Sequence, residues 1–187
     1  MIHIIKETAS GTTLLPLVDE TFARREIYLS GEITDELADD MTRQVRYLAG
    51  QNHDPITVYI NSPGGNVSAG LAIYDVLMSC GCTIHTVVAG EASSMAAVIL
   101  MAGETRHIYR HGMIFIHDPR EISYTAVTPE LAQERLKILH DYRSTIARIM
   151  SERSGQDERK LRRLMKDETR IDAAKAVELN LCTEMIT

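Results

Sequence analysis

The feature that most constrains the fold of this chain is the alternation of short β-branched runs with helical patterns in its middle. The run at 56–60, ITVYI, ends at a glycine-containing turn and precedes an amphipathic helical pattern over about 68–79. A second run at 83–88, TIHTVV, turns at Gly90 and leads into an apolar helix that begins near Ser93. Strands that alternate with helices in this way predict an α/β fold with a parallel sheet and crossover helices.

The two outer parts of the chain are predicted to differ in order. Residues 1–16 mix apolar and small polar residues without a sustained period, so we expect a partly flexible N-terminal arm. The longest helical pattern covers 128–153, with Thr128 as its cap, proline at the first helical position and a glycine after its end. A helix of this length is expected to project beyond the sheet as a handle that interlocks subunits.

Length, charge and composition narrow the class of protein. A chain of 187 residues with 44% hydrophobic residues can form the core of one domain, 1–187. Its net charge of -6 argues against nucleic acid and anionic membrane surfaces as partners. The longest apolar run is far shorter than the ~20 residues of a membrane-spanning helix, and the first residues lack a secretion signal. We therefore expect a cytoplasmic protein with no membrane partner.

The three cysteines are expected to pack rather than to do chemistry. An odd number of cysteines in a chain of this size indicates a reducing compartment. Cys80 and Cys82 lack the spacing of a redox or metal motif, and no histidine pair accompanies them. No nucleotide-binding glycine motif occurs either, so neither a metal nor a cofactor is expected.

Two β-to-α turns carry the residues best suited to catalysis: SPGG at 62–65 and GEASS at 90–94. Because the carboxyl ends of parallel strands gather at one edge, these turns are expected to face each other across a crevice. A serine at a helix start lies among unpaired N–H groups, which suits either an N-cap or a nucleophile. The glycines allow close backbone approach, as an oxyanion hole requires, although a plain turn or a phosphate cradle are alternatives.

A serine nucleophile needs a base, and one of the seven histidines is well placed for that role. His117 follows the strand-like run at 113–116 and precedes Pro119. A histidine after an apolar strand is often structural, so the pattern alone leaves both interpretations open.

Three segments, in order along the chain, resemble the signature of the Clp protease proteolytic subunit: YINSPGGNVSAGLAIYD at 59–75, GEASSMAA at 90–97 and IHDP at 116–119. The resemblance extends from about 27 to 186. It implies the spiral of β-β-α units shared with crotonase-like proteins, with a projecting handle helix. It also implies a serine endopeptidase that cleaves unfolded polypeptides inside two stacked heptameric rings, a tetradecamer fed by a hexameric ATPase unfoldase.

The resemblance further implies roles for individual residues. Ser94 matches the nucleophile and His117 the general base. The backbone N–H groups of Gly65 and Met95 match the oxyanion hole, where they would donate to the charge that forms on the substrate carbonyl oxygen.

The third member of the catalytic triad departs from the family pattern. The family's aspartate falls on Glu168, with Asp167 beside it as the alternative residue to orient the histidine. The segment 120–127 also lacks the glycine pair that usually follows the histidine motif. Two alternatives therefore stay open: a weak or inactive subunit with a structural role in the ring, and a crotonase-like enzyme that acts on acyl thioesters.

Overall fold

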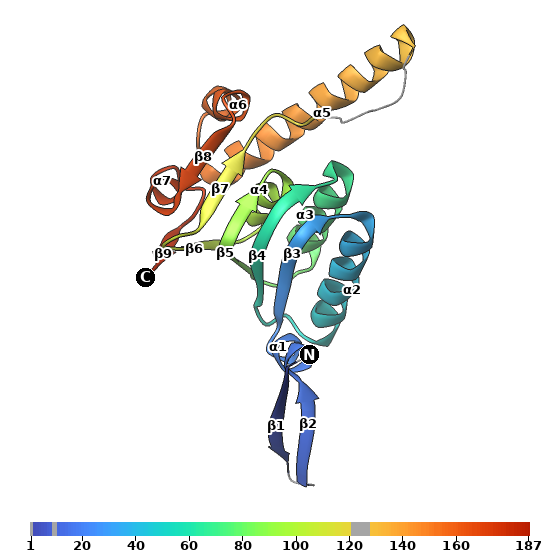
Figure 1. The fold of residues 1–187 in the computed structure, drawn as a ribbon, viewed down its shortest axis with the longest axis vertical. Coiled ribbons are helices and arrows are strands. Elements are labelled where there is room, and N and C mark those ends of the chain that lie inside the picture. The colour runs from blue at the N-terminus through green and yellow to red at the C-terminus, as the bar shows by residue number, and fades with distance from the viewer. Residues whose placement is uncertain (1, 9–10, 121–127) are drawn as a thin grey trace.

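The computed structural model describes residues 2–8, 11–120 and 128–187 (Figure 1). Its strands are β1 (His3–Thr8), β2 (Gly11–Pro16), β3 (Glu26–Ile33), β4 (Ile56–Gly65), β5 (Ile84–Ser93), β6 (Thr105–Tyr109), β7 (Met113–Ile116), β8 (Thr169–Asp172) and β9 (Glu184–Ile186). Its helices are α1 (Leu17–Ala23), α2 (Asp35–Gln51), α3 (Val67–Ser79), α4 (Met95–Leu100), α5 (Pro129–Ser154), α6 (Glu158–Lys166) and α7 (Ala173–Glu178). The predicted α/β class with a parallel sheet is confirmed.

The sheet divides along β5, and this division sets the geometry of the site. Strands β3, β4, β5, β6 and β9 pair in that order, all parallel. The first half of β5 pairs with β6 as far as Val88, whereas its second half, from Glu91, pairs with β7. The other edge of β7 pairs antiparallel with β8. The second half of β5 and the strands β7 and β8 thus form a small extension of the sheet.

The predicted turn at Gly90 is wrong, because β5 continues through this residue to Ser93. A Cβ atom on Gly90 would collide with the side chain of Asn61, whose Oδ1 accepts a hydrogen bond from the Glu91 N–H at 3.2 Å. The glycine therefore allows β5 to stay close to β4 rather than ending the strand. Strand β8, which the sequence analysis did not predict, supplies the outer edge of the extension.

The most deeply buried element is α4, which lies against the sheet beside α3 (Figure 1). Every residue from 95 to 102 exposes 2% or less of its surface. Burial of each large apolar side chain contributes roughly 1.5–3 kcal/mol, so this short helix is held by packing rather than by its own length. The residue before it, Ser94, is therefore attached to a rigid part of the core.

Among the described helices, four begin with a threonine or aspartate side-chain cap, one of which is the predicted cap at Thr128. Thr34, Thr128, Asp157 and Asp172 each accept a hydrogen bond from the backbone N–H three residues ahead. These bonds satisfy N–H groups that a helix start leaves without an intrahelical partner. They fix the first turns of α2, α5, α6 and α7.

The long helix predicted over 128–153 is α5, which projects away from the sheet (Figure 1). Its buried residues all lie in its second half, from Ile146 onward. The first half leaves Leu131, Leu136 and Ile138 exposed by 38%, 57% and 44%. In the isolated chain, the apolar side of the projecting half is therefore uncovered.

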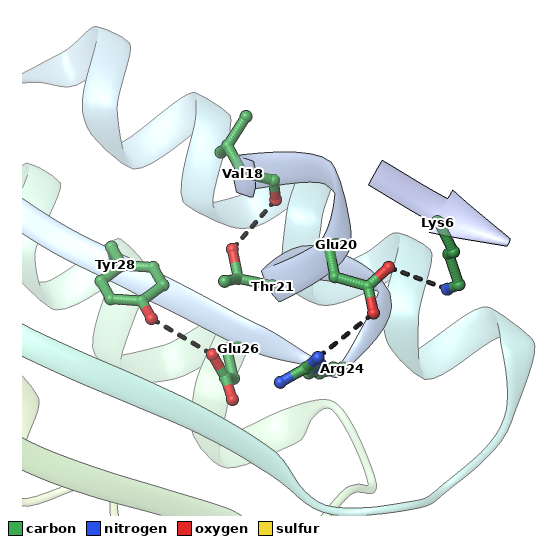
Figure 2. Close-up of polar contacts among 7 residues, drawn as sticks. All are labelled: Lys6, Val18, Glu20, Thr21, Arg24, Glu26 and Tyr28. Atoms are coloured by element: carbon green, nitrogen blue, oxygen red, sulfur yellow. Dashed lines mark hydrogen bonds and ion pairs between the residues drawn. The ribbon is translucent and has the colours of Figure 1, made fainter. Parts of the chain in front are cut away.

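The N-terminal arm contains an antiparallel hairpin of β1 and β2, where the sequence showed no sustained pattern. The hairpin lies at one end of the molecule and the projecting part of α5 at the other (Figure 1). Figure 2 shows its link to α1: Glu20 of α1 accepts a hydrogen bond from Lys6 of β1 at 2.8 Å. Glu20 also accepts one from Arg24, the residue after α1, at 3.4 Å. These contacts, the Lys6 hydrogen bond foremost, lower the pKa of Glu20 below its ordinary value.

Two further observations concern the described residues as a whole. No helix in these ranges combines the length and apolar character needed to cross a bilayer. All three cysteines are free, and Cys82 and Cys182 are buried, as packing residues would be.

Candidate active site

Ser94 joins β5 to α4 in a backbone conformation that residues other than glycine rarely adopt. Its φ is 55° and its ψ is -121°, and such a residue costs on the order of 1–3 kcal/mol. The side chain does not cap α4, so the N-cap interpretation is wrong for Ser94. The hydroxyl of Ser93 instead donates to the Glu91 carboxylate at 2.9 Å. The burial of α4 offsets this strain. The Ser94 hydroxyl makes no capping hydrogen bond to the helix.

The two segments predicted as turns lie next to each other, but most of their residues belong to strands: β4 continues to Gly65 and β5 to Ser93, and the two strands pair at Ser62 and Ala92. The segments also approach each other at Gly64. This glycine has a φ of +92°, and a Cβ atom on it would lie 2.6 Å from the Ser93 carbonyl oxygen and 2.7 Å from the Ser94 Cβ. The turn is fixed by Ser62, whose buried hydroxyl donates to the Gly31 carbonyl and accepts from the Gly64 N–H. Gly64 was not singled out from the sequence, because only packing distinguishes it from its neighbour.

Gly65 lies against β3 rather than against the serine. A Cβ atom on Gly65 would collide with the backbone of Ile33, whose carbonyl accepts the Asn66 N–H at 2.8 Å. Met95 begins α4 with a buried side chain that packs where a Cβ atom on Gly70 would lie. Donation by the Gly65 and Met95 N–H groups to an oxyanion stays a prediction.

The end of β7 brings His117 to the serine. The Ser94 N–H donates to the Phe115 carbonyl at 2.7 Å, and Ser93 pairs with Phe115 in the parallel register of β5 and β7. Ser94 and His117 consequently line one small cavity of about 20 Å³, enough for about one water. The rest of its lining is apolar: Val67, Met95, Val98, Ile116, Pro119, Ile146, Met150 and Met165.

The imidazole of His117 is oriented by the backbone. Its Nδ1 lies 2.6 Å from the carbonyl oxygen of Asp118, and its ring packs 5.3 Å from that of Phe115. No hydrogen bond joins Ser94 to His117 in the described part of the chain. Catalytic hydrogen bonds are commonly longer before substrate binds, so the shared cavity is the informative observation.

The two predicted triad acids contact arginines instead of the histidine. Glu168 Oε1 lies 2.8 Å from Arg120 Nη2, with both side chains about half exposed. Asp167 ends α6, and its carboxylate lies 3.7 Å from Arg163. A role for either acid in orienting His117 stays a prediction. The rest of the segment after Arg120, residues 121–127, lies outside the described residues.

A third acid, Asp118, directly follows His117 in the chain and was not singled out from the sequence. Asp118 Oδ1 lies 2.9 Å from Nε of Arg143 in α5. The contact is an ion pair without hydrogen-bond geometry, and both atoms are buried with no hydrogen-bond partner among the described residues. The sequence does show an acid beside His117 in the IHDP motif. It does not show that this acid pairs with Arg143, which lies 25 positions later in α5.

A wider hollow lies next to the serine cavity, and Val67 lines both. It is bounded by the 65–68 segment, Arg120, Ile138, Leu139 and Tyr142. The Tyr142 hydroxyl lies 2.8 Å from that of Ser68, which ties α5 to the start of α3. Within the described ranges, no group of three or more His, Cys, Asp or Glu side chains is arranged to hold a metal ion.

Comparisons with known proteins agree on one family. The model of the family "Clp protease" matches residues 10–187. The chain is 33% identical to the ATP-dependent Clp protease proteolytic subunit 2 of Bacillus licheniformis, over 93% of this chain and 92% of that protein. It is 30% identical to the proteolytic subunit 2 of Chlamydia pneumoniae, over 99% and 92%.

A solved structure shows the same fold. A mutant of ClpP1 from Listeria monocytogenes superposes with a TM-score of 0.82 at 28% identity, covering 91% of this chain and 96% of that one. The chain therefore belongs to the Clp protease family and has the ClpP fold.

Proposed function

We propose that this chain is a serine endopeptidase that cleaves unfolded polypeptides in the cytoplasm. The observation that carries the proposal is the strained strand-to-helix junction at Ser94, which lines one cavity with His117. A serine alone would be ambiguous. A serine that does not cap its helix, and that lines one cavity with a histidine and lies against Gly64, has the groups that acyl transfer needs.

In the proposed reaction, the Ser94 oxygen attacks the carbonyl carbon of a peptide bond while its proton passes to Nε2 of His117. The carbonyl electron pair moves to the oxygen, which accepts hydrogen bonds from the Gly65 and Met95 N–H groups. Collapse of this intermediate expels the amine, which takes the proton from His117. Water then attacks the acyl ester in the same way and releases the second product.

We further propose that the active form is an assembly of two heptameric rings fed by a hexameric ATPase unfoldase. The exposed apolar side of α5, at Leu131, Leu136 and Ile138, is suited to contact between subunits. The relatives described above carry the name ATP-dependent Clp protease proteolytic subunit. An enclosed chamber admits unfolded chains and excludes folded proteins, which explains the need for a separate unfoldase.

Cleavage of a fluorogenic peptide by matched serine variants tests the proposal. Ser94→Ala should lower kcat by about 10⁴-fold or more, because it removes the nucleophile. Ser93→Ala is the control and should retain activity, since its hydroxyl contacts Glu91 rather than the cavity. Equal activity of Ser94→Ala and the wild-type chain would refute the proposal.

An inactive ring subunit is the second candidate, and one observation favours it: Glu168 is paired with Arg120 instead of His117. A wild-type chain that assembles into rings but cleaves no peptide, with or without an unfoldase, would support this candidate. The acyl-thioester enzyme gains no support, because the relatives described above are all proteolytic subunits.

A further inference from the structure

We infer that the backbone carbonyl of Asp118 orients His117 in place of a triad carboxylate, and that Arg143 positions this carbonyl through its ion pair with Asp118. The inference rests on the proposed function, because it assigns a partner to the proposed base. Its basis is the juxtaposition of two contacts: His117 Nδ1 to the Asp118 carbonyl, and the Asp118 carboxylate to Arg143.

The first step follows from what each atom can do in a hydrogen bond. A carbonyl oxygen can only accept, so the 2.6 Å contact requires Nδ1 of His117 to carry the proton. In the neutral ring, the lone pair is then on Nε2. This is the nitrogen that must take the proton of the serine, and the same tautomer is selected by the carboxylate in a Ser-His-Asp triad.

The second step concerns what holds the carbonyl in place. Residues 117 and 118 follow the end of β7, so the ladder between β7 and β8 does not fix them. The Asp118 side chain does so instead, because its Oδ1 lies buried 2.9 Å from Arg143 Nε. The two side chains are only about one third exposed, so water screens their attraction only in part, and this attraction favours their staying together.

Arg143 is itself on a rigid support. The next turn of α5 contains the buried residues Ile146 and Ala147, which anchor this part of the helix in the core. The chain of contacts therefore runs from the core through α5 and Arg143 to Asp118, and from its carbonyl to the imidazole of His117. Arg143 is a positioning residue that does not touch the substrate.

The two other candidate acids are engaged elsewhere. The Glu168 carboxylate is paired with Arg120, and that of Asp167 with Arg163. Arg170, from the strand next to β7, lies over the Phe115 ring at 4.9 Å rather than over the imidazole. Neither Glu168 nor Asp167 is required to explain the tautomer of His117.

Kinetics of four variants test the inference on the full-length protein. Arg143→Met should lower kcat for a fluorogenic peptide on the order of 10- to 100-fold, as expected for a displaced base, with KM nearly unchanged. Arg143→Lys keeps the charge and should recover most of the loss. Arg148→Met is the control and should retain kcat, because Arg148 is an exposed arginine of the same helix. Glu168→Gln separates this inference from the predicted triad role of Glu168, which requires kcat to fall. Mass in solution and thermal melting show which variants still fold and assemble.

Solid-state ¹⁵N NMR of histidine-labelled protein provides a readout that does not depend on cleavage. The His117 signals, assigned by their loss in His117→Gln, should show a protonated Nδ1 in the wild-type chain and in Glu168→Gln. Arg143→Met should give a mixture of tautomers.

The inference is overturned if Arg143→Met changes neither kcat nor the tautomer, or if Glu168→Gln changes the tautomer. A wild-type chain that cleaves no peptide would refute the proposed function instead. The tautomer comparison between Arg143→Met and the wild-type chain would in that case still confirm or refute this inference.

Discussion

The junction at Ser94 and the N-terminal hairpin are opposite in how they are held. The junction continues into α4, whose residues are almost completely buried, and this packing sustains an unfavourable backbone conformation. The hairpin exposes Ile5 and Leu14 by 73% and 64% and is tied to α1 by the ion pair of Lys6 with Glu20. The candidate site thus lies where burial is greatest, whereas the hairpin depends on weaker surface contacts.

Truncating one apolar residue in each region should show the largest difference. Ile99→Ala in α4 removes a fully buried side chain and should cost about 2–5 kcal/mol of unfolding free energy. Ile5→Ala in the hairpin should change it by less than about 0.5 kcal/mol. Urea unfolding measures both, and similar costs for the two variants would contradict the comparison.

Replacing a glycine by alanine should distinguish the Ser94 junction from an exposed helix position, with a smaller effect on stability. Gly64→Ala forces a Cβ atom against Ser93 and Ser94 and should lower kcat by about 10²-fold. Gly50→Ala is the matched control, because that glycine is an exposed position of α2 with open space around it. The control should gain up to about 1 kcal/mol of stability at unchanged activity. Full activity in Gly64→Ala would show that the turn does not constrain the serine.

Alkaline pH should act on the buried core through Cys182. Burial raises the pKa of the Cys182 thiol to about 12, well above its ordinary value near 9. The folded state therefore favours the protonated thiol. This contribution to stability is complete below about pH 9 and is lost as the pH rises toward 12. In Cys182→Ala, the fall in melting temperature over this range should be smaller than in the wild-type chain; an identical fall would exclude the thiol as its cause.

Acidic pH should destabilise the hairpin, and this is the smallest effect expected among these predictions. Because the pKa of Glu20 is lowered, its contacts stabilise the hairpin above about pH 4.5 and are lost as the pH falls through the lowered value. Amide hydrogen exchange of β1 and β2 should accelerate in that range, without change in α4. In Glu20→Gln, hairpin exchange should already be fast at pH 7. A hairpin unaffected by this variant would show that backbone pairing alone holds it.

Local sequence patterns predicted the elements that local forces determine. The strand that begins at Ile56 and the long helix with its cap at Thr128 each follow from neighbouring residues, although β4 continues past the predicted end at residue 60 to Gly65. The continuation of β5 past Gly90 did not, because its second half is specified by pairing with β7, more than twenty residues later.

The same distinction applies to the site. Ser94 and His117 were recognisable from their motifs, since each follows a strand at a turn. The ion pairs Asp118–Arg143 and Arg120–Glu168 were not, because a charged side chain carries no local mark of its partner. Which of the two glycines contacts the serine is likewise decided by packing between strands. Gly64 lies against Ser93 and Ser94 at the end of β5, and Gly65 lies against Ile33 in β3.

The most direct test of the account is the site at which a serine-reactive phosphonate ester attaches, located by mass spectrometry of the assembled protein. The account predicts one adduct on Ser94 in the wild-type chain and its loss in His117→Ala. An assembled ring with no adduct on Ser94, or labelling that persists without the imidazole, would contradict it.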